Sequence, residues 1–143
     1  MAKAINLVTS NLSLSTVNSK DILLLIDTVK QGIKYSIFHS LAKKIPFRMN
    51  EWSNFLNLSE RTMQRYKRKK ITFDSIYSEK IIGITLLYKM GVDVFGDNAK
   101  FNTWLEIENI ALGRIKPKEL LETTFGIGLL KDELGRIEHG VLA

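Results

Sequence analysis

Apolar side chains recur every three or four residues over the stretch 19–45, a spacing that predicts amphipathic helices rather than strands. The stripe consists of Ile22, Ile26, Val29, Ile33, Ile37, Leu41 and Ile45. Ser19 suits the N-cap position ahead of it, because its hydroxyl can accept hydrogen bonds from the free amides of a first turn. Gly32 interrupts the stretch and divides it into two helices that end before Pro46.

A second apolar stripe predicts a long helix over residues 74–90, closed by Gly91. Its inward side chains are Ile76, Ile81, Ile84, Leu87 and Tyr88. Shorter helices follow over residues 99–105, 117–124 and 127–139, separated by glycine and proline. No segment alternates with a period of two for long enough to build a sheet, so the chain is predicted to be all-α.

Composition excludes several classes of function. The 143 residues include no cysteine, which removes disulfides, thiolate catalysis and cysteine-based metal sites. The two histidines, His39 and His139, lie too far apart in sequence to suggest a ligand pair. The glycines form no phosphate-binding loop, and no nucleophile is paired with a base. We therefore expect no enzyme, no cofactor and no metal.

Targeting signals are also missing from the pattern. No apolar run approaches the roughly 20 residues that a membrane helix requires. Residues 1–10 lack the apolar core of a signal peptide. We expect a cytoplasmic protein with no membrane partner.

Residues 49–66 have the pattern of a helix-turn-helix. Ser53 is small where the two helices must cross closely, and Asn57 tolerates the positive φ that the turn requires. Leu58 can pack behind the turn, while Ser59 can cap the second helix. The inner apolar face consists of Trp52, Phe55, Leu56, Met63 and Tyr66.

The charge around this motif indicates what kind of partner it binds. The chain carries 21 basic and 15 acidic residues, a net charge of +6, and residues 61–80 alone contribute seven basic against two acidic side chains. Such a concentrated stripe favours a polyanionic partner. A solvated basic edge on an ordinary helix pair is the alternative.

A recognition helix presents its first turns to base edges while flanking cations hold phosphates. The outward residues predicted to face DNA are Glu60, Arg61, Thr62, Gln64 and Arg65. Those predicted to follow the phosphates are Lys67, Arg68, Lys69 and Lys70. Arg61 and Arg65, four residues apart, can make forked contacts to guanine or phosphate. Glu60 either selects cytosine or interacts with the positive end of the helix dipole.

The carboxyl-terminal region has an apolar helical face of its own. Leu130, Leu134, Ile137 and Val141 share one side, and Leu129 and Leu142 lie beside it. Lys131, Arg136, Glu138 and His139 surround that face. Such a helix can dock into a partner's groove, although packing on the chain's own core is the alternative.

An ordered series of short motifs then suggests a family. The series comprises Val94-Phe95-Gly96-Asp97, Trp104-Leu105, Asn109-Ile110-Ala111-Leu112-Gly113, Pro117-Lys118-Glu119-Leu120-Leu121, Gly126 and Leu134-Gly135-Arg136-Ile137-Glu138-His139-Gly140-Val141. It resembles the toxin-binding domain of the Xre/MbcA/ParS antitoxins. The helix-turn-helix resembles the Xre-like half of the same proteins, although Asn57 and Ser53 stand where glycine and alanine are usual. The likeness covers residues 32–143.

The resemblance implies a bacterial type II antitoxin encoded beside a RES-domain toxin that depletes NAD. Such antitoxins are all-helical homodimers that close the toxin's active site and bind operator DNA to repress their own operon. A nucleoid-associated fraction is implied when the operator is bound. The residues that match the C-terminal signature, with their neighbours, form the expected toxin contact: Leu130, Lys131, Leu134, Arg136, Ile137, Glu138, His139, Gly140, Val141 and Leu142. The alternative is a helix-turn-helix regulator without a toxin partner.

Three regions are expected along the chain. Residues 1–18 lack a sustained helical period and are predicted to form a flexible arm or one weak strand. Residues 19–90 form the helix-turn-helix domain, which continues into a toxin-binding domain over residues 91–143.

Overall fold

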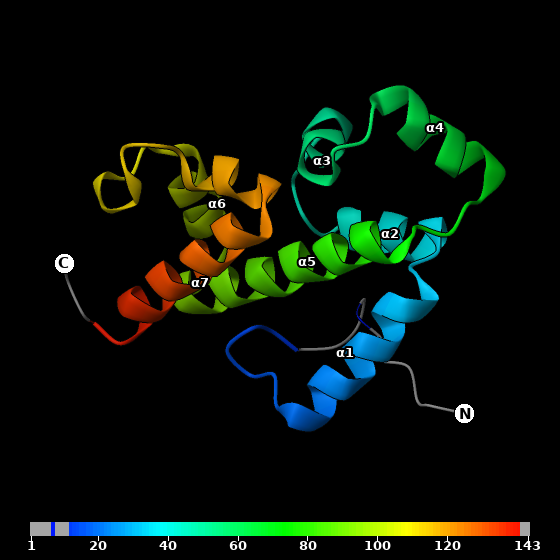
Figure 1. Ribbon diagram of the computed structural model, residues 1–143. Helices are drawn as coiled ribbons and strands as arrows, with labels where there is room; N and C mark the ends of the chain where they lie inside the picture. Colours follow the sequence, from blue (N-terminus) through cyan, green and yellow to red (C-terminus); the bar gives the residue numbers. More distant parts are fainter. Residues whose placement is uncertain (1–6, 8–11, 141–143) are drawn as a thin grey trace.

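A computed structural model describes residue 7 and residues 12–140, and throughout them the ordered elements are helices (Figure 1). The elements are α1 (Ser19–Gln31), α2 (Tyr35–Ala42), α3 (Met49–Leu56), α4 (Glu60–Lys69), α5 (Ser75–Phe95), α6 (Asn98–Glu106), η1 (Ile110–Leu112), η2 (Pro117–Glu122) and α7 (Thr124–Glu138). Strand pairing in this part of the chain is limited to two isolated bridges, Lys34–Thr72 and Asn109–Ile115. The predicted all-α class is confirmed.

Helix α5 is the common support for both halves of the protein. Figure 1 shows α1 to α4 gathered around its first half, and α6 and α7 around its second half. Ile82 and Leu86 on one side of α5 and Ile84 on the opposite side are all at most 5% exposed, so the helix is buried on two opposite faces. The predicted boundary at residues 90–91 therefore falls within one continuous helix, and the two halves share a core.

Gly91 does not end the long helix, contrary to the sequence prediction. It lies buried inside α5, where a Cβ would clash with the ring of Phe101 on α6. The glycine allows α6 to pack closely against α5. The helix ends at Gly96, whose left-handed φ of 87° suits a residue without a side chain.

The described part of the predicted N-terminal arm is packed against the core. Leu7 is 3% exposed and Ser13 is wholly buried. The Lys89 ammonium donates a hydrogen bond to the Leu7 carbonyl (2.7 Å). These contacts correct the flexible-arm prediction for residues 7 and 12–17.

The N-cap of α1 lies one residue earlier than the sequence predicted. Asn18, not Ser19, is the N-cap, and its side chain and that of Asp21 each accept the other's backbone amide, at 2.9 and 3.2 Å. Gly32 ends α1 with a φ of 86°, as the division into two helices predicted.

Several side chains predicted to face inward are exposed. On α1, Leu25 is buried while Ile22 and Ile26 are each 46% exposed. The segment 22–26 is apolar at every position, so its periodicity does not select a face. Ile37 and Ile76 are also exposed, at 41% and 70%.

Two of the later helices differ from their predicted form. Residues Pro117–Glu122 form a 3₁₀ helix rather than an α-helix. Helix α7 begins at Thr124, three residues before the predicted start, because Thr123 caps it by accepting the Gly126 amide (2.9 Å). Gly126 also packs against the Leu120 carbonyl, where a Cβ would clash.

Candidate nucleic-acid interface and partner surface

Helices α3 and α4 form the predicted helix-turn-helix, and the turn residues have the predicted roles. Asn57 adopts a left-handed conformation with a φ of 56°. The Leu58 amide donates to the Ser53 carbonyl (2.9 Å), and the Ser59 hydroxyl accepts the Thr62 amide (3.0 Å) at the start of α4. The inner side chains are all buried: Trp52, Ser53, Phe55, Leu56, Met63 and Tyr66.

The outer face of α4 is exposed and strongly basic. Its exposed residues are Glu60, Arg61, Gln64, Arg65, Lys67, Arg68 and Lys69, followed by Lys70 at the C-cap. None of the ion pairs found within residues 12–140 involves these cations. Neutralising them by contact with a polyanion therefore disrupts no salt bridge in this part of the fold.

Two predicted members of this face have local structural roles. Thr62 is half-buried, and its hydroxyl accepts a hydrogen bond from Ser59 (2.9 Å), so it belongs to the cap rather than to the exposed face. Glu60 lies in the first turn of α4, where a carboxylate interacts favourably with the helix dipole. Lys67, Arg68 and Lys69 occupy the last turn, where cations are favoured.

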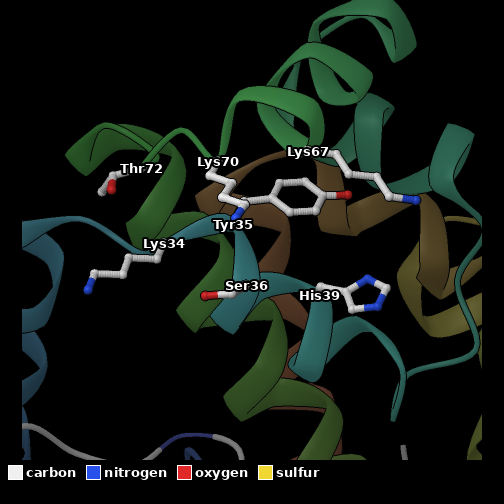
Figure 2. Close-up of a pocket in the computed structure, with 7 residues that line it drawn as sticks. All are labelled: Lys34, Tyr35, Ser36, His39, Lys67, Lys70 and Thr72. Atoms are coloured by element: carbon white, nitrogen blue, oxygen red, sulfur yellow. The ribbon is translucent and has the colours of Figure 1, made fainter.

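A hollow of about 570 Å³ lies beside the last turn of α4, against the start of α2 (Figure 2). Its lining residues are Lys34, Tyr35, Ser36, His39, Lys67, Lys70 and Thr72. The two segments are joined by the Lys34–Thr72 bridge and by the Tyr35 amide, which donates to the Ile71 carbonyl (3.3 Å). Sequence reasoning missed the α2 residues of this hollow, because no local pattern relates them to α4.

On α7, the predicted partner contact is divided between core and surface. Leu130 and Leu134 are wholly buried in the chain's own core, so their side chains do not form a contact surface in this conformation. This corrects their assignment as toxin-contact residues. Lys131, Arg136, Glu138, His139 and Gly140 are exposed and Ile137 is half-buried. The remaining two predicted residues, Val141 and Leu142, lie outside the described residues.

The exposed polar residues of α7 surround a second hollow of about 570 Å³. Its lining residues are Leu14, Ser15, Met90, Lys131, Asp132, Gly135, Arg136, Glu138 and His139. The segment before α1 therefore contributes to this surface, which the sequence did not predict. Within it, Arg136 is held by an ion pair to the buried carboxylate of Glu133.

Exposed apolar side chains lie at the other end of α7. Phe125 is 92% exposed and Leu129, one turn later, is 42% exposed. Exposed large apolar side chains in proximity are typical of protein contact sites. The sequence interpretation placed Leu129 beside the apolar face but left both Leu129 and Phe125 out of the predicted contact.

Lys118 joins the C-terminal half to the helix-turn-helix. Its ammonium lies 2.5 Å from carboxylate oxygens of both Glu51 on α3 and Glu106 on α6. It also lies 5.1 Å from the centre of the Phe47 ring. Burial alone lowers the pKa of Lys118, but its hydrogen bonds to Glu106 and Glu51 raise that pKa overall. Burial likewise raises the pKa of Glu51, yet hydrogen bonds from Arg48 and Lys118 hold it below its usual value.

The described ranges, residue 7 and residues 12–140, contain neither a metal site nor a membrane-spanning helix. No group of three or more histidine, cysteine, aspartate or glutamate side chains in them is placed to hold a metal ion. None of their helices has both the length and the apolar character needed to cross a bilayer.

Comparison with known proteins gives two adjacent family matches. Residues 24–84 match the antitoxin Xre-like helix-turn-helix domain, and residues 90–140 match the antitoxin Xre/MbcA/ParS C-terminal toxin-binding domain. The chain is 29% identical to an Antitoxin Xre of Yersinia enterocolitica over 83% of its own length and 81% of that protein. It is 28% identical to an Antitoxin Xre of Photorhabdus laumondii, over 67% of this chain and 71% of that protein.

Proposed function

The chain is an antitoxin of the Xre/MbcA/ParS type with a DNA-binding helix-turn-helix domain and a toxin-binding domain, and from this premise we propose which partners each domain engages. The cognate toxin is a RES-domain protein that depletes NAD, as the motif series of the C-terminal half implies. The antitoxin binds over the toxin's active site. It also binds double-stranded operator DNA and represses its own operon in the bacterial cytoplasm, at the nucleoid when the operator is bound.

The proposed DNA contact rests on one observation: a correctly capped helix-turn-helix presents exposed cations that take part in none of the ion pairs found in residues 12–140. Helix α4 enters the major groove, where Arg61, Gln64 and Arg65 reach base edges. The basic last turn of α4 holds the flanking phosphates. A homodimer places two such helices about 34 Å apart, one turn of DNA, which suits a two-fold symmetric operator.

The proposed toxin contact uses the exposed side chains of α7 and the residues that follow it. The polar part comprises Lys131, Arg136, Ile137, Glu138, His139 and Gly140, continuing into Val141 and Leu142. Phe125 and Leu129 supply the apolar anchor, because desolvated aromatic side chains carry much of the energy of protein interfaces. Leu130 and Leu134 support this helix from the core.

Co-expression with the adjacent gene tests the proposal. The small protein encoded beside this one should arrest growth and lower cellular NAD when expressed alone, and the antitoxin should restore both. A neighbour that binds the antitoxin but leaves NAD unchanged would refute the RES assignment. If no adjacent product binds at all, a regulator without a toxin becomes the better account.

Surface variants test the placement of the toxin contact. Phe125→Ala combined with Leu129→Ala should weaken rescue while the thermal unfolding curve stays unchanged, because both side chains are exposed. Ile107→Ala is the matched control, since Ile107 is also exposed, at 59%, but lies outside α7. Full rescue by the double variant would show that the anchor lies elsewhere.

A further inference from the structure

Tyr35 is 6% exposed, yet its hydroxyl points into the hollow beside α4 (Figure 2). Within residues 12–140, no hydrogen bond to another side chain or backbone group satisfies this hydroxyl. The hydroxyl is not among the buried side-chain atoms that lack a partner in the described residues, so it is open to the hollow and able to hydrogen-bond a ligand there. Burial also raises the pKa of Tyr35, which keeps the hydroxyl protonated and able to donate.

The surroundings of this hydroxyl favour an anion. Figure 2 shows it directed toward the side of the hollow where Lys67 and His39 lie. The His39 ring stacks on the Tyr35 ring with centroids 6.5 Å apart, so the imidazole is held at the same site. No acidic side chain is among the residues that line the hollow.

The start of α2 adds to this electrostatic preference. Lys34 is its N-cap and makes no side-chain capping hydrogen bond to the first turn. The N-terminus of a helix carries partial positive charge, which favours anions, although the Tyr35 amide here is already donated to the Ile71 carbonyl. Ser36, in that first turn, contributes a further hydroxyl to the lining.

We infer that this hollow, the Tyr35 site, holds one backbone phosphate of the DNA, at the edge of the groove in which α4 lies. The inference rests on the proposed DNA binding and adds a contact from outside the helix-turn-helix. The Tyr35 hydroxyl donates to a phosphate oxygen, while Lys67 supplies charge and His39 a ring N–H donor. Because Tyr35 belongs to α2 and Lys67 to α4, one phosphate contacts both helices and fixes how α4 is oriented in the groove.

Two variants of the full-length protein test the site, by fluorescence anisotropy with operator duplex over a range of salt concentrations. Tyr35→Phe should weaken binding roughly fivefold, the effect of one lost hydrogen bond. The slope of log Kobs against log salt concentration is negative, and Lys67→Gln should reduce its magnitude by about 0.9, the contribution of one phosphate contact. Tyr77→Phe and Lys100→Gln are the matched controls, and both should bind as the unaltered protein does.

Synthetic duplexes with single methylphosphonates locate the phosphate itself. One position should weaken binding of the unaltered protein but have little effect on a Tyr35→Phe/Lys67→Gln double variant. Each protein is compared with itself on modified and unmodified duplexes, so the result holds even if Tyr35→Phe lowers stability.

The outcomes separate this inference from the proposed function. If the unaltered protein binds operator and both variants bind equally well with the same methylphosphonate map, the Tyr35 site is refuted and DNA binding stands. If inorganic phosphate shifts the His39 resonances but no methylphosphonate position is sensitive to the double variant, the site takes free phosphate and the inference is wrong. If the unaltered protein binds no DNA, the proposed function and this inference both fail.

Discussion

Replacing Lys118 by methionine should loosen the contact between the two halves of the protein. The Lys118 ammonium bridges Glu51 on α3 and Glu106 on α6, each at 2.5 Å, and its side chain is 14% exposed. Methionine keeps most of the apolar stem and removes the charge, so the perturbation is mainly electrostatic.

The two ion pairs differ in environment, which sets the expected cost. The Glu51 side chain is 24% exposed, and a hydrogen bond between charged groups in such a site contributes roughly 1.5–3 kcal/mol. The Glu106 side chain is 52% exposed, so solvent reduces its pair to about 0.2–1 kcal/mol. We expect Lys118→Met to lower the free energy of unfolding by about 2–3 kcal/mol, or roughly 4–12 °C in Tm for a chain of this size.

The pH dependence of this loss follows from the two shifted pKa values. Glu51 has a folded-state pKa below its ordinary value of 4.5, so its contribution is fully present above pH 4.5 and is lost as pH falls through the folded pKa. Lys118 has a folded-state pKa above 10.5, so its contribution is fully present below pH 10.5 and is lost only as pH rises through the folded pKa. The difference in free energy of unfolding between Lys118→Met and the unaltered protein should be constant between these limits and should shrink on the acid side.

Urea unfolding of both proteins, followed by circular dichroism at neutral and acid pH, measures this difference. Lys116→Met is the control, because Lys116 is exposed and takes part in none of the ion pairs found in residues 12–140. Equal stability of Lys118→Met and the unaltered protein, or a difference that persists unchanged below pH 4.5, would refute the reasoning.

Three further predictions concern α4 and the core. Gly91→Ala should lower the free energy of unfolding by about 1–3 kcal/mol in urea titrations, because its methyl group clashes with the Phe101 ring; unchanged stability would contradict the close packing of α5 and α6. Ser59→Ala should cost about 1 kcal/mol in the same assay through loss of the α4 cap, whereas exposed Ser75→Ala provides a comparison without that hydrogen bond. The slope of log Kobs against log salt concentration for operator binding should be about −3.6 per protomer if Lys67, Arg68, Lys69 and Lys70 each meet one phosphate; a slope near zero would exclude a backbone-dominated contact.

The helix-turn-helix was predictable residue by residue because its signals are local. Asn57, Leu58 and Ser59 are adjacent in sequence, and each acts on a helix end within five residues of itself. The exposed basic face of α4 follows from the same periodicity. Local spacing therefore suffices to predict the helix-turn-helix and the basic face of α4.

Other features depend on which element covers which face, and periodicity does not encode that. The apolar stripe of α7 was evident, but α7 packs against both α5 and η2, and Leu130 and Leu134 of that stripe are wholly buried in the core. Gly91 has the pattern of a helix end, yet it marks a close approach by Phe101. The Tyr35 site likewise requires α2 to meet α4, a contact between segments about thirty residues apart.

The central claim is that operator DNA and toxin are bound by different surfaces, α4 and α7. It is tested most directly by measuring operator affinity of the purified toxin–antitoxin complex that carries Arg61→Glu and Arg65→Glu. The account predicts that this complex assembles as the unaltered one does and that its operator affinity is lower by a factor of about 100 or more. A folded double variant that no longer assembles with the toxin, or a complex that still binds operator with full affinity, would contradict it.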